Sequence, residues 1–272
     1  MAFDLDGLIA CLEMTEVEPG VVEGQNLDIG YHRVFGGQII AQMVTAAAQA
    51  SPDKSVKSLT VLFPREGDTA KPMRYRVDKL QDGRTFGTTQ ITATQDDKVI
   101  SAAVVSMHAD EDGLHHSAPL PSVGAPDTAT QIDVPMVPWE VRSVGGVDLV
   151  ARDAGPPRYE MWMRAGSVVD SRALHQALLA HATDLTIIGT ALRPFEGVSQ
   201  ADSTVTLHTA VTSHSMWFHQ PFRIDEWFLI AQESPVVANG RGFGRGEVFT
   251  EAGECVASFA QESMIRRLEP KP

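Results

Sequence analysis

Two stretches of the chain are near-copies of each other: Asp82-Gly83-Arg84-Thr85-Phe86-Gly87 and, 157 positions later, Asn239-Gly240-Arg241-Gly242-Phe243-Gly244. The match continues without gaps, so that 82–107 and 239–264 share nine identities in 26 positions, whereas chance gives roughly two. The later identities are Val99 with Val256, Ser101 with Ser258, Ala103 with Ala260, Ser106 with Ser263 and Met107 with Met264. The chain is therefore predicted to contain an internal duplication.

Each copy predicts the same run of antiparallel strands. Its Asp-Gly or Asn-Gly pair favours a tight turn, because these residues tolerate positive φ. Alternating strands are expected at Thr88–Thr94 and Arg245–Thr250, followed by strands at Val99–Met107 and Cys255–Met264.

A helix is predicted upstream of each run of strands. Gly37–Ala50 is rich in alanine and has apolar residues at helical spacing. Ser171–Asp184 carries leucines on one face, with Asp170 as the expected N-cap. One helix followed by several antiparallel strands, twice over, indicates an α+β architecture.

Proline marks the boundary between the two halves. Seven of the 16 prolines fall between Asp110 and Pro157, in an acidic stretch with weak apolar periodicity. Such a composition indicates a long surface connection. We expect an N-terminal unit over 8–109, a proline-rich acidic linker over 110–157 and a C-terminal unit over 158–268.

Composition excludes several classes of protein. The 272 residues include 22 basic and 35 acidic side chains, a net charge of −13, which disfavours a nucleic-acid partner. The two cysteines cannot form a disulfide framework or a thiolate metal site. With no basic leader and no run of ~18 apolar residues, the sequence predicts a cytoplasmic protein that does not insert into membranes.

Comparing the halves identifies two candidate polar residues. Aligning the two helices sets Ala46 against Asp184, and the 157-residue offset sets Val104 against Gln261. The second half thus has a carboxylate and an amide where the first half has small or apolar residues. The alternative interpretations are a solvated aspartate at a helix end and a glutamine that faces water.

Several familiar site motifs are absent from the sequence, including G-x-S-x-G, the phosphate-binding G-x-x-x-x-G-K-[ST] and H-E-x-x-H. The nine histidines share no recognised ligand spacing and are interpreted as solvated or structural. No metal and no cofactor are expected.

An ordered set of motifs resembles the acyl-CoA thioesterase II family. In the first half the motifs are Arg33-Val-Phe-Gly-Gly-Gln38, Phe63-Pro-Arg-Glu-Gly-Asp68 and Asp82-Gly-Arg-Thr-Phe86. In the second half they are His175-Gln176, Thr183-Asp184-Leu185, His214-Ser-Met-Trp-Phe-His219, Pro221-Phe222, Glu226-Trp227, Arg241-Gly-Phe243, Val256-Ala-Ser258 and Gln261-Glu262. The resemblance extends from about residue 8 to residue 266.

This resemblance implies a double hotdog, in which two helices are each wrapped by an antiparallel sheet within one chain. It also implies hydrolysis of fatty acyl-CoA to free fatty acid and CoA by direct attack of water. The family assigns water activation to an aspartate on the second helix, a threonine or serine on a strand, and a glutamine on the last strand. Asp184 and Gln261 match the first and third of these.

The second member of the trio does not match. By the family pattern Val211 occupies the hydroxyl position, and Ser213 occupies that of an aspartate. Thr212 points to the opposite face of a regular strand and could substitute only if a one-residue bulge re-aimed it. Ser213 shares the face of Val211 without any bulge. The trio is therefore reduced to two residues or completed by Thr212 or Ser213.

Candidates for substrate binding are less specific. Gly36 and Gly37 could bring backbone N–H groups near a thioester, or could form a tight junction into the helix. Lys54–Arg84 has eight basic and four acidic residues, a local charge of +4. It is either part of a surface for the CoA phosphates or an ordinary solvated strand edge.

Three functions are consistent with the sequence. The preferred one is an acyl-CoA thioesterase whose activity is reduced by Val211. The second is an acyl-CoA binding or sensing protein of the same fold, and a dehydratase or hydratase ranks last because no convincing Asp/His pair is present. The resemblance also predicts a homodimer or a higher homo-oligomer.

Overall fold

The computed structural model describes residues 3–134 and 136–268. Its helices are α1 (Leu5–Leu12), α2 (Gly36–Ala50), α3 (Arg172–Thr183) and α4 (Ile187–Leu192). Its strands are β1 (Thr15–Glu18), β2 (Val21–Gly24), β3 (Ser55–Leu62), β4 (Met73–Asp82), β5 (Phe86–Gln95), β6 (Lys98–His108), β7 (Thr130–Ile132), β8 (Glu140–Ser143), β9 (Arg158–Arg164), β10 (Leu207–Phe218), β11 (Phe228–Ala238), β12 (Arg241–Thr250) and β13 (Cys255–Arg267).

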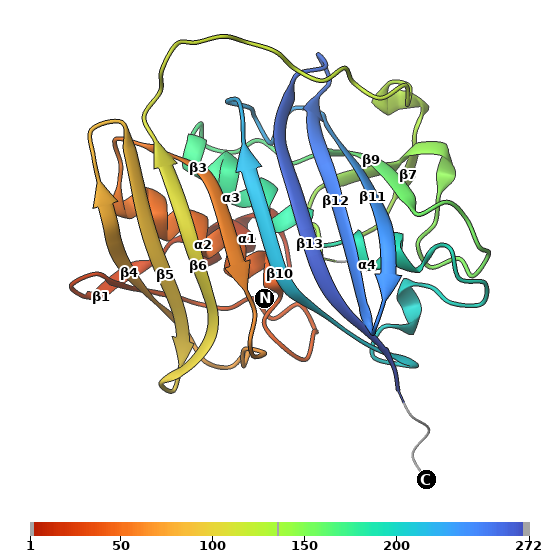
Figure 1. Ribbon diagram of the computed structural model, residues 1–272, viewed down its shortest axis with the longest axis horizontal. Helices are drawn as coiled ribbons and strands as arrows, with labels where there is room; N and C mark the ends of the chain where they lie inside the picture. Colours follow the sequence, from red (N-terminus) through yellow and green to blue (C-terminus); the bar gives the residue numbers. More distant parts are fainter. Residues whose placement is uncertain (1–2, 135, 269–272) are drawn as a thin grey trace.

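The strands form one continuous antiparallel sheet in the order β1-β2-β4-β5-β6-β3-β10-β13-β12-β11-β9-β8-β7. The strands of the first half lie at one end and those of the second half at the other (Figure 1). The halves join where β3 pairs with β10, from Ser58 opposite Trp217 to Leu62 opposite Ser213. The fold is the expected α+β double hotdog, with its two sheets fused through this pair.

The two long helices lie together behind the sheet (Figure 1). They run antiparallel, because Gly36 at the start of α2 lies beside Asp184 at the end of α3. Residues from both helices and both halves share one apolar core, including Ile40 on α2, Leu178 on α3 and Phe259 on β13. Each half therefore depends on the other for its packing.

The observed elements include all the strands and helices predicted for both copies, but α3 is one residue shorter at each end than the predicted Ser171–Asp184. Ser171, not Asp170, is the N-cap of α3, since its side chain accepts a hydrogen bond from the Leu174 N–H. Asp170 instead contacts His175 and Arg223 through ion pairs. Two neighbouring residues can both cap a helix, and the sequence alone did not distinguish them.

The stretch 110–157, which the sequence predicts as a linker, contains two short strands in its described part. Its first part crosses from β6 to the far edge of the sheet (Figure 1), and it then forms β7 and β8, which extend the sheet beyond β9. Leu120, Val123 and Val144 pack on a small cluster around Trp162, whose indole N–H donates to the Gly124 carbonyl. Strands of three and four residues among prolines give no readable periodicity, which is why the sequence did not reveal them.

The register of the last strand differs from the 157-residue offset. Val104 is 51% exposed and Gln261 is 1% exposed, so the two lie on opposite faces of the sheet. The glycines of the repeated stretch show the shift: Gly87 pairs with Met107 and Gly244 pairs with Gln261. Equating Val104 with Gln261 was therefore wrong, although Gln261 does stand out as a polar residue on a buried face.

Candidate active site

Asp184 lies where the end of α3 meets the start of α2. It is the C-cap residue of α3 and is 5% exposed. A Cβ built on Gly36 would lie 2.6 Å from Asp184 Oδ2, and one built on Gly37 would lie 2.6 Å from the His181 carbonyl oxygen. The two glycines therefore permit the close approach of α2 to the end of α3, which brings Gly36, Gly37 and Asp184 together.

Burial controls the charge of Asp184. Desolvation raises the pKa of its carboxyl to about 8, against weaker opposing effects of the Gly37 backbone N–H and the Arg33 guanidinium. Oδ1 of Asp184 has no hydrogen-bond partner among the described residues. A buried carboxylate oxygen without a protein donor is poised to accept a proton or a hydrogen bond from a ligand.

Gln261 belongs to a chain of hydrogen bonds that starts next to Asp184. Thr183 Oγ1 lies 3.1 Å from His214 Nε2, and His214 Nδ1 lies 3.0 Å from Gln261 Oε1. Gln261 Nε2 then donates to Ser263 Oγ at 3.1 Å. All four side chains are 0–1% exposed. This buried network connects the end of α3 with β10 and β13.

His214 is a neutral member of this network. Burial lowers the pKa of its imidazole to about 4, although the hydrogen bond to Gln261 acts in the opposite direction. With Gln261 Oε1 facing His214 Nδ1, a neutral ring donates from Nδ1 and leaves Nε2 unprotonated. The ring also stacks on Phe259. His214 is therefore held between Gln261, Thr183 and Phe259.

The burial of Asp184 and Gln261 removes the alternative interpretations in which they are solvated. From the sequence, His214 is interpreted as one of nine scattered histidines. Its hydrogen-bond connection with Thr183 and, through Gln261, with Ser263 is not predicted. One available signal was the position of Thr183 directly before Asp184. The pairing of β10 with β13 could not be read from the sequence.

The candidates for the strand hydroxyl take separate positions. Val211 pairs with Ser263 and Ser213 pairs with Glu262, so a bulge falls at Thr212. The Thr212 hydroxyl donates to the Glu262 carbonyl at 3.0 Å. Ser213 precedes the buried His214 in the strand and so lies on the opposite face. Neither hydroxyl joins the network of His214 and Gln261.

Four of the eight basic side chains in Lys54–Arg84 form ion pairs with carboxylates. Lys54 contacts Asp53 and Asp82, and Lys71 contacts Asp68 and Asp96. Further pairs join Arg74 to Glu18 and Glu23, and Lys79 to Asp82. Much of the local charge of +4 is therefore balanced by neighbouring acidic side chains.

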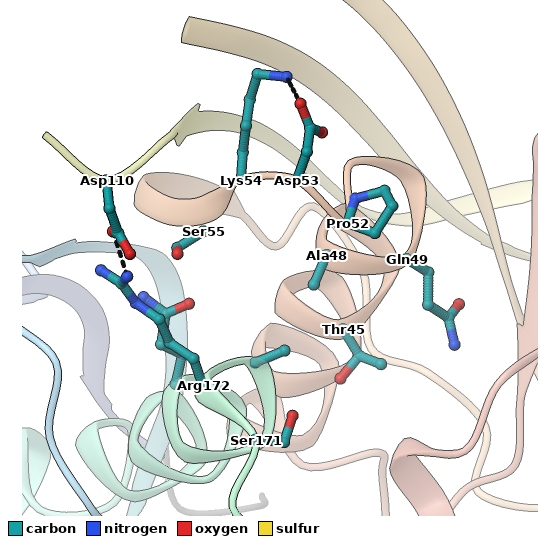
Figure 2. A pocket seen from close by; sticks show the side chains of 12 residues that line it. Thr45, Ala48, Gln49, Pro52, Asp53, Lys54, Ser55, Asp110, Ser171 and Arg172 are labelled. Carbon is teal, nitrogen blue, oxygen red and sulfur yellow. Dashed lines mark hydrogen bonds and ion pairs between the residues drawn. The ribbon is translucent and has the colours of Figure 1, made fainter. Parts of the chain in front are cut away.

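A surface pocket of about 510 Å³ lies between the C-terminal end of α2 and the N-terminal end of α3, at the ends of the two helices away from Asp184. Figure 2 shows Thr45 and Ala48 of α2 near Arg172 of α3 and its N-cap, Ser171. At the rim, Lys54 is bonded to Asp53, and Arg172 to Asp110. Thr45 is the helix counterpart of Thr183, and the residue after it is Ala46 instead of an aspartate. This end thus has the helix pairing of the Asp184 site without its carboxylate.

Two general properties of the described residues complete the site description. In residues 3–134 and 136–268, no group of three or more His, Cys, Asp or Glu side chains is arranged to hold a metal ion. Within these same ranges, no helix is long and apolar enough to cross a membrane.

The fold and this site define a class: a double-hotdog protein with a buried carboxylate between its two helices. Comparison with family models gives the acyl-CoA thioesterase N-terminal domain over residues 25–108 and the C-terminal domain over residues 110–265. The chain belongs to the acyl-CoA thioesterase II family.

Individual relatives span nearly the whole chain. Acyl-CoA thioesterase 2 of Haemophilus influenzae is 32% identical, covering 96% of this chain and 98% of the relative. Human acyl-coenzyme A thioesterase 8 is 30% identical, covering 94% and 87%. The crystal structure of an acyl-CoA thioesterase II from Mycobacterium marinum superposes with a TM-score of 0.82 at 29% identity, covering 96% of this chain and 99% of that one.

Proposed function

We propose that this protein hydrolyses fatty acyl-CoA to free fatty acid and CoA by direct attack of water. The observation that carries the proposal is the buried Asp184 carboxylate, whose Oδ1 lacks a protein donor, at the N-terminal end of α2. A carboxylate with a raised pKa is suited to take a proton from water near neutral pH.

The reaction uses the groups of the site in sequence. The water oxygen bonds to the thioester carbonyl carbon while its proton passes to Asp184. The backbone N–H of Gly36, at the start of α2, stabilises the oxyanion of the tetrahedral intermediate, whereas the backbone N–H of Gly37 donates to Asp184. The C–S bond then breaks, the proton moves to the CoA sulfur, and acid and thiol leave. The amide of Gln261, oriented by His214, holds the attacking water.

The first test is Asp184→Asn with a thiol-release assay on a panel of acyl-CoA chain lengths. We expect kcat to fall by roughly 10³-fold or more, because the amide cannot accept the proton. Folding should persist, since Asn has nearly the same shape and the site is buried. Undiminished hydrolysis in the folded variant would exclude Asp184 as the base.

A matched control is Asp202→Asn. Asp202 is also buried, at 3% exposed, but its carboxylate accepts from Ser199, Thr206 and Arg152 in a structural turn. We expect this variant to lose stability and to keep its kcat. The pair separates loss of the base from loss of any buried carboxylate.

An acyl-CoA binding or sensing function is the second candidate. Val211 favours it, because the position assigned to a hydroxyl by the family pattern is apolar. Tight binding of acyl-CoA without release of thiol by the wild-type protein would support this function over hydrolysis. The cytoplasmic location and the homo-oligomer stay predictions.

A further inference from the structure

Ser263 is a buried hydroxyl on the face of the sheet that carries Gln261. It lies on β13 and is 1% exposed, two residues after Gln261 and therefore on the same face. Its partner on β10 is Val211 and its partner on β12 is Gly242. The hydroxyl that is missing at Val211 is thus present directly across the strand pair.

Hydrogen bonds and helix packing connect Ser263 with the segments on either side of Asp184. The network from Thr183 through His214 and Gln261 ends on Ser263 Oγ. On the other side α4, which begins three residues after Asp184, packs on the glycines of β12. A Cβ on Gly244 would lie 2.7 Å from Ile187, and one on Gly242 would lie 3.4 Å from Ala191. The residues before and after Asp184 both contact this part of the sheet.

The hydroxyl has a hydrogen-bond position left over. A serine oxygen can accept two hydrogen bonds and donate one, and the bond from Gln261 uses one acceptor position. Apart from Gln261, the inward residues of β13 near Ser263 are Phe259 and Ile265, which are apolar and buried. A polar group in such surroundings costs stability unless it is satisfied, so a buried hydroxyl here indicates a selected role.

We propose that Ser263 supplies the hydroxyl of the active site, in place of one at Val211, and binds the attacking water together with Asp184 and Gln261. The inference rests on the proposed function. It assigns no role to Thr212, whose proton is used by the Glu262 carbonyl, or to Ser213, which lies on the opposite face.

The test compares Ser263→Ala, Ser263→Thr and the double variant Ser263→Ala/Val211→Thr in the thiol-release assay. Ser263→Ala should lower kcat by roughly 10²-fold, the effect of losing one preorganised hydrogen bond, with little change in KM. Ser263→Thr should keep most of the activity. Adding Val211→Thr to Ser263→Ala should raise kcat at least about tenfold above that of Ser263→Ala alone, because it supplies a hydroxyl from the paired strand.

Ser101→Ala is the matched control for a purely structural effect. Ser101 is also buried on the inner side of its strand, β6, and donates to the Leu62 carbonyl at 2.9 Å. It should lose stability with no change in kcat. If Ser263→Ala does not fold, Ser263→Cys tests the same point, because it keeps the shape and weakens the hydrogen bond.

The outcomes separate this inference from the proposed function. If the wild type is active, Asp184→Asn is inactive and Ser263→Ala keeps normal turnover, only the role of Ser263 is overturned. Failure of Val211→Thr to restore any activity to a folded Ser263→Ala variant also overturns it, since a hydroxyl at residue 211 would then be unable to replace the one at Ser263. A wild type without hydrolysis rejects the proposed function itself.

Discussion

Asp184 is subject to opposing effects from its surroundings. The C-terminal end of α3 disfavours a negative charge, whereas the N-terminal end of α2 favours one. Arg33 also favours the ionised form, but burial has the largest effect and raises the pKa of the carboxyl to about 8. The site therefore stabilises the protonated acid at neutral pH and holds a stronger base than an ordinary aspartate.

This pKa gives a prediction for the pH dependence of hydrolysis. Asp184 acts as a base only when ionised, so kcat/KM should rise about tenfold per pH unit below about 8 and level off above it. The pKa of His214, near 4, keeps that ring neutral throughout this range. The measurement is kcat/KM from pH 5.5 to 9.5, with the background hydrolysis of the thioester subtracted.

Asp202→Asn should show the same profile, because Asp202 lies outside the site. A profile that is flat across pH 6 to 9, or one that falls with rising pH, would contradict ionisation of Asp184 as the activating step. The unperturbed aspartate pKa near 4 would place the whole rise below this window.

At this scale the sequence predicts Asp184 as a site residue because its helix counterpart is Ala46, and the structure shows that it is buried. Its reason for choosing Gln261 was a register that the structure corrects. His214 and Ser263 escaped notice because their significance depends on which residues of β10 and β13 face each other. Strand pairing between distant segments is not encoded in local pattern.

At the scale of elements, the start of α2 is the part most adapted to the site. Its N-cap is Phe35, which makes no side-chain capping bond, and two glycines follow at Gly36 and Gly37. A helix start without a capping side chain leaves backbone N–H groups available for a ligand. The element thus gives up local stability where the oxyanion is expected to lie.

Alanine substitutions at the two glycines should have different effects, one on turnover and the other on stability. Gly36→Ala places a methyl group 2.6 Å from Asp184 Oδ2, a side-chain atom that can move, so we expect a folded protein with kcat reduced by roughly 10²-fold. Gly37→Ala meets the His181 backbone carbonyl oxygen at 2.6 Å, which cannot move without shifting α3. We expect it to destabilise the fold by roughly 1–3 kcal/mol.

Thermal unfolding and turnover of both variants test this difference. Gly197→Ala is unsuitable as a control because its positive φ adds strain, whereas Gly113→Ala meets no neighbouring atom and should change neither property. Full activity in Gly36→Ala would show that the Asp184 carboxylate can lie elsewhere during turnover.

The elements themselves were largely predictable. Both long helices and the central strands have apolar residues at regular spacing, and this local pattern is enough to predict them. The bulge at Thr212 and the strands β7 and β8 were not, because they depend on pairing partners far away in the chain.

At the scale of the whole molecule, the β3–β10 pair joins what the sequence shows as two copies. Leu59 and Met216 face each other across this junction, 1% and 0% exposed, in the core shared by both halves. The proposed site also spans the junction, since Gly36 comes from the first half and Asp184 from the second. It therefore needs both halves of the chain.

We therefore expect the chain to unfold in a single cooperative transition, and Leu59→Ala to shift that whole transition. Removing a buried leucine side chain costs roughly 2–5 kcal/mol, and both halves share the loss because their core is continuous. Leu80→Ala, which truncates a leucine that is 60% exposed on β4, should change stability by no more than about 0.5 kcal/mol. Calorimetry measures the transition, and hydrogen exchange in β5 and β12 reports each half separately. Two transitions, of which Leu59→Ala lowers only the one that includes β5, would show that the halves are thermodynamically independent in spite of the continuous sheet.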